Sequence, residues 1–138
     1  MAAEKYRQIA RQFLGIPYRH GGRDREGLDC VGLAHLFYRE LGIKVPDSDG
    51  RPYPTDWYKK DPERLLQGLL KVGRAVDLKT EPLQPLDLVY FRMGGAITHA
   101  GVMVDQRSFL HVLTRKTVEI TPLTLAWKRR LQGARRLL

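Results

Sequence analysis

One cysteine and two histidines of this chain have the residue types and positions of a thiol-based catalytic site. Cys30 is the only cysteine, and it stands where an amphipathic helix is predicted to begin, directly after a candidate capping residue, Asp29. The unpaired N–H groups and the positive dipole of a helix N-terminus favour the thiolate, which is the nucleophilic form of cysteine. Cys30 also lies on the apolar face of this helix, so a small buried core residue is the alternative interpretation.

His99 and His111 are candidates for the base that would take the proton of the thiol. They lie in two consecutive predicted strands that are joined by a three-residue loop. This loop length pairs Val104 with Ser108 and Gly101 with His111, and it places both imidazoles on one face of the sheet as diagonal neighbours. A two-residue loop would place them on opposite faces. The alternative is two unrelated, half-buried histidines.

The remaining chemistry-bearing residues suggest a metal site only weakly. Two histidines and a cysteine are a possible zinc ligand set, with Asp29 nearby. The sequence contains no short Cys-x-x-Cys or His-x-x-x-His pair, so we expect neither a metal nor a cofactor. His35 lies off the apolar stripe of its predicted helix, and we interpret it as a surface residue.

The elements that must position these residues favour an α+β fold. Apolar periodicity predicts helices at 3–14, 30–41 and 62–71, followed by strands at 74–78, 86–92, 97–104, 108–113 and 117–120. Asp61 is the predicted cap of the third helix, and the segment with Leu125 and Trp127 is predicted as a short helix or a last strand. Helices followed by strands indicate N-terminal helices packed on a C-terminal antiparallel sheet, in one domain over residues 1–138.

Composition narrows the functional classes. The chain has 138 residues and a formal net charge of +9. Its apolar runs are too short for a membrane span, and residues 1–11 lack the apolar core of a secretion signal, so we expect a soluble protein without a leader. The charge favours an anionic partner such as a cell-wall polymer, or reflects only a solvated basic face. The sequence contains no zinc knuckle or RNP-like motif, so nucleic acid is not expected as the main ligand.

Five short motifs follow one another in a recognisable order. Residues 15–22 read GIPYRHGG and residues 28–33 read LDCVGL; residues 85–91 read PLDLVYF, residues 98–104 read THAGVMV and residues 109–111 read FLH. Together they resemble the NlpC family of cell-wall cysteine peptidases, whose motifs are G-x-P-Y-x-x-G-G, D-C-S-G-L, P-G-D-L and x-H-V-G-I-Y. The resemblance extends over roughly residues 3–121.

The resemblance implies a papain-like α+β fold with a Cys–His–His triad. Cys30 would be the nucleophile, His99 the base and His111 the residue that orients His99. The hydroxyl of Tyr18 and the backbone N–H of Cys30 would bind the oxyanion. The implied reaction is hydrolysis of a peptidoglycan stem peptide through a thioester, often between γ-D-glutamate and the diamino acid. His99 would take the thiol proton, or the pair would rest as thiolate and imidazolium.

Three positions depart from the family motifs. Val31 replaces the serine after the cysteine, Leu86 replaces the glycine before an aspartate, and His20 stands where many relatives have tryptophan. None of these removes a triad residue, but Val31 puts the family's substrate subsite preference in doubt. The segment 46–60 is an insertion in which Trp57 and Tyr58 would pack on the core or form a wall that recognises substrate; we favour packing.

The expected absence of a leader and the segments 17–24 and 127–133 also resemble a subgroup found in phage tails and gene-transfer particles. This implies tail proteins as partners for a protein that is cytoplasmic when made; a cytoplasmic enzyme that recycles wall fragments is the alternative. Two other functions remain open: an idle docking module of a tail, and a thiol acyltransferase or amidase acting on a lipid or a small amide. An acyltransferase predicts an apolar channel beside Cys30, whereas a wall peptidase predicts a polar groove open at both ends.

Overall fold

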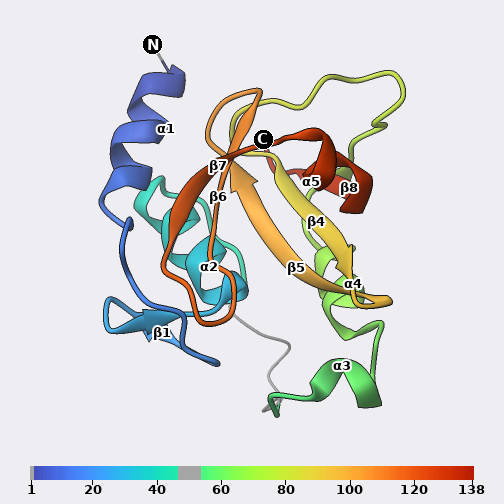
Figure 1. The fold of residues 1–138 in the computed structure, drawn as a ribbon. Coiled ribbons are helices and arrows are strands. Elements are labelled where there is room, and N and C mark those ends of the chain that lie inside the picture. Colours follow the sequence, from blue (N-terminus) through green and yellow to red (C-terminus); the bar gives the residue numbers. More distant parts are fainter. Residues whose placement is uncertain (1, 47–53) are drawn as a thin grey trace.

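A six-stranded antiparallel sheet organises the chain in the computed structural model, which describes residues 2–46 and 54–138 (Figure 1). The strand order is β3-β8-β4-β5-β6-β7, and a separate two-stranded hairpin pairs β1 with β2. The helices are α1 (Ala2–Arg11), α2 (Cys30–Glu40), α3 (Trp57–Lys60), α4 (Arg64–Leu69) and α5 (Leu125–Arg130). The strands are β1 (Arg23–Asp24), β2 (Gly27–Leu28), β3 (Arg74–Ala75), β4 (Leu88–Met93), β5 (Ala96–Met103), β6 (Ser108–His111), β7 (Glu119–Pro122) and β8 (Leu131–Arg136).

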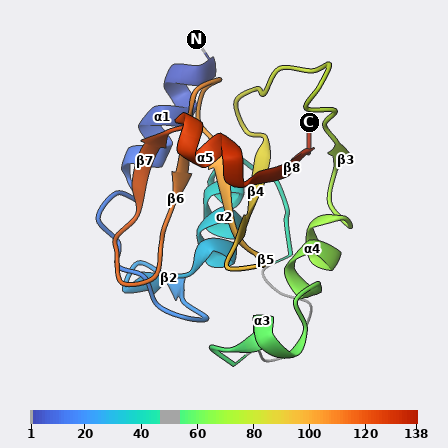
Figure 2. The same cartoon turned by 45° about the vertical axis from the view of Figure 1, so that its right-hand side comes forward.

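The two faces of this sheet carry separate apolar clusters because side chains alternate along each strand. Leu88, Ala100 and Val102 face the helix α2 and pack with its buried residues Leu33 and Phe37. Neighbouring residues of the same strands point to the other face, which α5 covers (Figure 2). That second cluster contains Val89, Phe91, Met103 and Phe109, with Trp127 of α5 packed against them.

The β5–β6 hairpin has the register that the three-residue loop predicts. Val102 pairs with Leu110 and Met103 with Phe109, and the N–H of Val104 donates to the carbonyl of Ser108. A β-bulge lies one residue before His99, where the pairing of β4 with β5 skips Thr98. Bulges of this kind re-aim the neighbouring side chains. The predicted α+β architecture is confirmed.

Several predicted boundaries are wrong. The predicted helix 62–71 corresponds to the shorter α4, and Asp61 does not cap it: Asp61 is the C-cap of the preceding helix α3, and α4 begins only after Glu63. The predicted helix 3–14 ends at Arg11, and the predicted strand 74–78 contains only two paired residues. The irregular stretch after Pro17 contains the β1–β2 hairpin.

The C-terminal segment is both a helix and a strand. After α5, the chain enters β8, which lies between β3 and β4 in the sheet. Arg136 of β8 makes two hydrogen bonds to the buried carboxylate of Asp87, at 2.9 and 2.8 Å. This pairing joins segments far apart in the sequence, so local periodicity could not predict it.

Leu86 stands in the left-handed region with φ of 74°, which explains the glycine that the family motif has there. Its side chain is only 4% exposed and packs in the core beside α2. We expect Leu86→Gly to relieve about 1 kcal/mol of backbone strain but to lose about 2–5 kcal/mol of buried packing. Urea unfolding should therefore show a net destabilisation of about 2 kcal/mol.

Arg115 is the matched control for this variant, because it has φ of 66° but an exposed side chain. We expect Arg115→Gly to change the free energy of unfolding by less than about 1 kcal/mol, since no packing is lost. A Leu86→Gly protein as stable as the wild type would show that the packing of Leu86 contributes little.

Candidate functional site

Asp29 makes Cys30 the first residue of α2. Its carboxylate accepts hydrogen bonds from the N–H of Gly32 at 2.8 Å, the N–H of Gly21 at 2.9 Å and the guanidinium of Arg23 at 2.8 Å. The first bond caps the helix as predicted, and the other two tie the preceding loop to it. The backbone of this loop lies against the first turn of α2 so closely that a Cβ added to Gly32 would lie 2.2 Å from the carbonyl oxygen of Gly22.

The surroundings of the Cys30 thiol favour its protonated form. Burial, followed by the negative charge of Asp29, raises the pKa of Cys30 to about 12. Backbone hydrogen bonds from Ala100 and Val31 and the positive charge of Arg23 lower the pKa, but by less. The helix N-terminus favours the thiolate, as the sequence indicates, but desolvation of the charged form opposes it and is the larger effect.

Replacing Asp29 by asparagine tests this electrostatic account. Asparagine keeps an oxygen that can cap α2 but removes the negative charge that raises the pKa of Cys30. We expect the pH midpoint of iodoacetamide alkylation of Cys30 to move downward in Asp29→Asn. Asp24→Asn, at an exposed position of β1, is the control and should leave the midpoint unchanged. An upward shift in Asp29→Asn would contradict this assignment.

His99 and His111 form a buried hydrogen-bonded pair. The Nε2 atom of His99 lies 2.9 Å from the Nδ1 atom of His111, and the residues are 5% and 1% exposed. Aromatic rings of Phe91, Phe109 and Trp127 surround the two imidazoles, with centroid distances of 4.3–5.7 Å. Burial lowers the pKa of His99 to about 3 and that of His111 to about 4. Both rings are therefore neutral near pH 7.

β5 connects the histidine pair to Cys30 through one backbone contact. The sulfur of Cys30 is hydrogen-bonded to the backbone of Ala100, the residue that directly follows His99. The hydrogen bonds among the described residues join His99 to His111 and the thiol to the main chain, and they do not include one between the sulfur and an imidazole nitrogen. Ala100 packs with Cys30 in the cluster beside α2, whereas the His99 ring contacts Phe91 and Trp127 of the cluster on the other face of the sheet, so the contacts of the described residues do not join the sulfur to the His99 ring.

Tyr18 lies beside Cys30 in the wall of a pocket. Burial and the proximity of Cys30 raise the pKa of the Tyr18 hydroxyl, and a hydrogen bond with the side chain of Thr114 opposes this shift. The backbone N–H of Cys30 belongs to the first turn of α2, whose N–H groups have no acceptor within the helix. The phenol and this N–H are thus two donors next to the sulfur.

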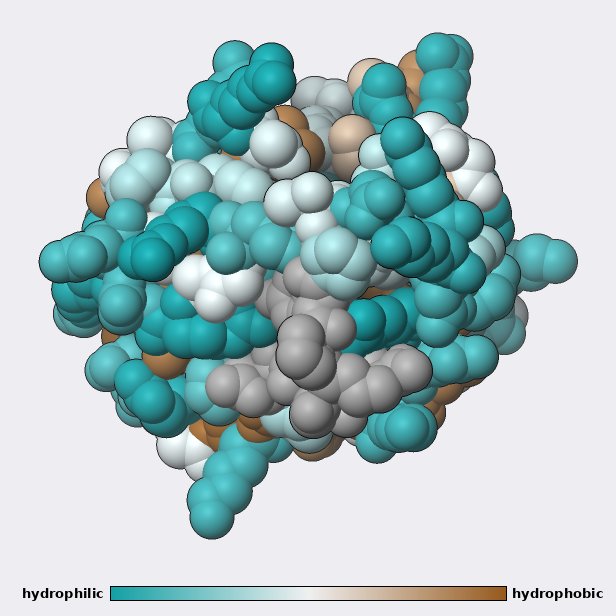
Figure 3. All heavy atoms as spheres, turned by 90° about the horizontal axis from the view of Figure 1, so that it is seen from below, coloured by the Kyte–Doolittle hydropathy of each residue, from teal (hydrophilic) through white to brown (hydrophobic). Residues whose placement is uncertain are grey.

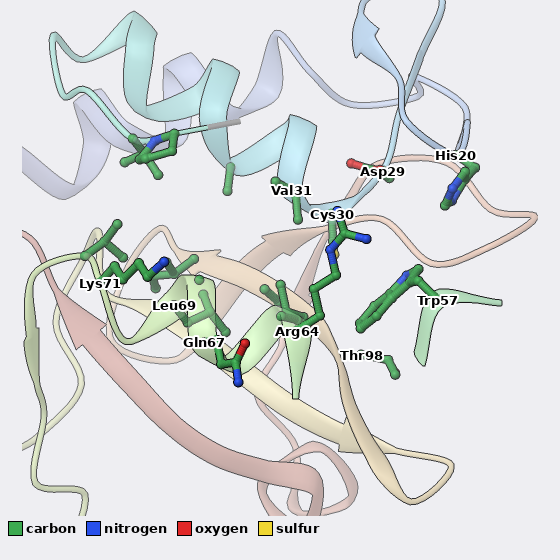
Figure 4. A pocket seen from close by; sticks show the side chains of 18 of the residues that line it. His20, Asp29, Cys30, Val31, Trp57, Arg64, Gln67, Leu69, Lys71 and Thr98 are labelled. Atoms are coloured by element: carbon green, nitrogen blue, oxygen red, sulfur yellow. The ribbon is translucent and has the colours of Figure 1, made fainter. Parts of the chain in front are cut away.

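The pocket has a volume of about 580 Å³ and places α3 and α4 opposite the start of α2 (Figure 4). Trp57 and Arg64 lie on the far wall, and Val31 and His20 lie on the side of Cys30. Apolar side chains such as Leu65, Leu69, Val72 and Leu88 line much of it, together with polar groups of Arg64, Gln67 and Lys71. The lining is therefore mixed. It matches neither the polar groove expected of a wall peptidase nor the apolar channel expected of an acyltransferase.

The insertion 46–60 contributes directly to this pocket through Trp57. No residue of α3 is buried, so the expectation that Trp57 and Tyr58 pack on the core is wrong for both. The part of the insertion at 47–53 lies outside the described residues.

Seen from below, the protein presents mostly hydrophilic side chains, with hydrophobic ones in small separate areas (Figure 3).

Other predicted features of the site have mixed outcomes. His35 is half-buried rather than on the surface, and its Nδ1 atom lies 2.6 Å from the carbonyl oxygen of Val45. Within residues 2–46 and 54–138, no three His, Cys, Asp or Glu side chains converge as metal ligands. No helix in these ranges combines the length and apolarity that crossing a bilayer requires.

Three residues near the histidine pair were not among the predicted site residues. Trp127 covers both imidazoles, and Thr121 and Glu119 lie beside His111 on β7. The sequence could have indicated Thr121 and Glu119, because they alternate along the predicted strand that follows the strand of His111. Trp127 offered no such signal, since it reaches the pair only through the packing of α5 on the sheet.

Comparisons with known proteins identify a family for this chain. The model of the NlpC/P60 family matches residues 15–136. Murein DD-endopeptidase MepS/Murein LD-carboxypeptidase of Escherichia coli is 30% identical over 90% of this chain and 57% of its own length. Gamma-D-glutamyl-L-lysine dipeptidyl-peptidase of Bacillus cereus is 30% identical over 99% of this chain and 37% of its own length.

A solved structure extends the likeness to the fold. The crystal structure of an NlpC/P60 family protein from Bacillus cereus superposes with a TM-score of 0.73, at 29% identity, over 100% of this chain and 41% of that chain. The chain spans little more than half of the MepS relative and less than half of the dipeptidyl-peptidase. The family match nevertheless covers most of the present sequence, and this chain belongs to the NlpC/P60 family.

Proposed function

We propose that this chain is a cysteine peptidase that hydrolyses amide bonds in peptidoglycan stem peptides. Cys30 is the nucleophile, His99 the general base, and His111 the residue that orients His99. Tyr18 and the backbone N–H of Cys30 donate to the oxyanion. The observation that carries the proposal is the hydrogen-bonded pair of neutral imidazoles on the strand whose next residue contacts the thiol.

The proposed reaction starts from a neutral thiol and a neutral imidazole. The Nε2 atom of His99 is engaged with His111, so Nδ1 takes the thiol proton while the sulfur attacks the carbonyl carbon. The resulting imidazolium gives that proton to the leaving amine as the C–N bond breaks, which leaves a thioester. His99 then takes a proton from water, the hydroxide oxygen attacks the thioester, and the thiol returns with the free carboxylate product.

The raised pKa of Cys30 and the lowered pKa of His99 both favour a neutral resting pair over an ion pair in the proposed mechanism. A thiol with a pKa of about 12 does not transfer its proton to an imidazole with a pKa of about 3 before substrate binds. Proton transfer is therefore coupled to attack on the carbonyl, where the oxyanion donors stabilise the developing charge. Of the two alternatives that the residues left open, we propose the general-base route.

The proposed substrate class rests on the family and on the activities for which its relatives are named, which include a murein endopeptidase and a γ-D-glutamyl-L-lysine dipeptidyl-peptidase. We propose the bond between γ-D-glutamate and the diamino acid as the first to test. The mixed lining of the pocket accommodates both the aliphatic and the charged parts of a stem peptide.

The experiment is a digest of purified muropeptides, analysed by liquid chromatography and mass spectrometry. Wild-type protein should release a new amine and a new carboxyl fragment, and Cys30→Ala should release neither. Binding to insoluble peptidoglycan without cleavage by the wild type would overturn the peptidase proposal and favour the idle docking module. Comparison of the wild type with Cys30→Ala therefore separates catalysis from binding.

A thiol acyltransferase or amidase acting on a lipid or a small amide is the second candidate. The apolar part of the pocket wall, with Leu65, Leu69 and Leu88, is the observation that favours it. Incubation with a thioester acyl donor and separate amine acceptors distinguishes the two reactions. Acyl transfer to an amine, with muropeptides left intact, would assign this second function.

We propose that the protein works in a phage or prophage tail, where it opens the wall from the particle tip. The resemblance of residues 17–24 and 127–133 to the subgroup found in phage tails and gene-transfer particles supports this proposal. Expression with the proteins encoded beside it, followed by particle purification, tests the proposal. Co-purification with tail proteins is the expected result, and recovery only in the cytoplasmic fraction would favour recycling of wall fragments.

A further inference from the structure

We propose that Thr121 and Glu119 are positioning residues that select the tautomer of the His99–His111 pair. The inference rests on the proposed function, because it assigns to these residues the task of keeping Nδ1 of His99 unprotonated. Neither residue contacts the thiol or the pocket. Both act through His111.

The register of β6 and β7 places these residues on one face. His111 pairs with Glu119 and Phe109 pairs with Thr121, so all four side chains point to the same side of the sheet. The Nε2 atom of His111 lies 2.8 Å from Oγ1 of Thr121 and 3.6 Å from Oε1 of Glu119. The Thr121 hydroxyl in turn donates to Oε1 of Glu119 at 3.2 Å.

The direction of this chain of hydrogen bonds follows from the chemistry of its last member. An ionised carboxylate can only accept, so the Thr121 hydroxyl donates to Glu119 and accepts from Nε2–H of His111. A neutral His111 with its proton on Nε2 has an acceptor at Nδ1, which receives the Nε2–H of His99. The remaining nitrogen of His99, Nδ1, then carries a lone pair.

The reverse direction of these hydrogen bonds, with His111 donating to His99, is disfavoured by the position of the Glu119 carboxylate. If His111 donated from Nδ1 to His99, its Nε2 would accept from Thr121, and the hydroxyl could no longer donate to Glu119. The carboxylate would then face two acceptor lone pairs at 3.2 and 3.6 Å. In that state, Nδ1 of His99 would be protonated and unable to act as a base. Glu119 thus determines the tautomer although its side chain is 57% exposed.

Three variants separate this role from simple packing. Thr121→Val keeps the shape but removes the hydroxyl, Thr121→Ser restores the hydroxyl, and Glu119→Ala removes the carboxylate at an exposed position where folding is little affected. Thr117→Val is the control, because Thr117 is exposed and belongs to the loop just before β7.

The readout is long-range proton–nitrogen NMR of the histidine rings, recorded without substrate at neutral pH. In the wild type, Thr121→Ser and Thr117→Val, we expect His99 and His111 to carry their protons on Nε2. In Thr121→Val and Glu119→Ala, signals of the Nδ1–H tautomer should appear. Unchanged tautomers in Thr121→Val and Glu119→Ala would overturn the inference.

Muropeptide hydrolysis is measured in parallel. We expect kcat to fall about 10-fold or more in Thr121→Val, with KM unchanged and with recovery in Thr121→Ser. If the tautomers shift as expected but the wild type cleaves no muropeptide, the proposed function fails while the positioning role stands. The wild type could instead cleave muropeptides while Thr121→Val and Glu119→Ala both keep its tautomers and its kcat. That result would overturn the positioning role and leave the proposed function intact.

Discussion

Replacing Cys30 by alanine is expected to reduce muropeptide hydrolysis by about 10⁴-fold or more, because no other group among the described residues can form the proposed thioester. The stability should change by no more than about 1 kcal/mol, since the substitution removes a single small sulfur atom. The rate is followed by amine release, and the stability by urea unfolding. The two measurements together distinguish a lost nucleophile from a lost fold.

Val31→Ala is the matched control for this variant. It truncates the neighbouring residue in the same pocket wall but leaves the thiol in place. We expect it to alter KM and to retain most of kcat. Hydrolysis that survives in Cys30→Ala at a rate near that of the wild type would refute the assignment of Cys30 as the nucleophile.

Replacing His99 by glutamine is expected to lower kcat by about 10²–10⁴-fold, the usual contribution of a general base. The pH dependence should also change. In the wild type, the base is neutral above its pKa of about 3, so the chemical step should be nearly constant around neutral pH. Without His99, only the thiolate fraction reacts, and far below a thiol pKa of about 12 this fraction rises tenfold per pH unit.

A pH–rate profile of both proteins between pH 6 and 9 checks this prediction. His35→Gln is the control, since it changes a half-buried histidine of α2 whose hydrogen-bond partner is the backbone carbonyl of Val45 rather than a proposed catalytic residue. A His99→Gln profile parallel to that of the wild type would mean that another group acts as the base.

The sequence was sufficient to predict those parts of the site that depend on local rules. The cap at Asp29 follows from residue type and position, and the common face of His99 and His111 follows from the parity of two strands and the length of their loop. Each of these features involves neighbours in the chain. They were therefore accessible without knowledge of the tertiary structure.

Features that depend on packing were not accessible in this way. Trp127 reaches the imidazoles because β8 enters the sheet beside β4 and carries α5 over that face. The raised pKa of Cys30 comes from burial, which a helix N-terminus in the sequence does not reveal. Trp57 lies in the pocket wall rather than the core because it begins α3, a separate short helix without a buried residue.

In the proposed mechanism Cys30 carries the acyl group of the substrate as a thioester, and partitioning with hydroxylamine tests for this intermediate. Wild-type protein is given a purified muropeptide and increasing hydroxylamine, and the acyl products are quantified by mass spectrometry. We expect the acyl product to divide between carboxylate and hydroxamate, with the hydroxamate share rising with the hydroxylamine concentration, while amine release does not slow. Cleavage that yields only the carboxylate at every hydroxylamine concentration, and that persists in Cys30→Ala, would contradict it.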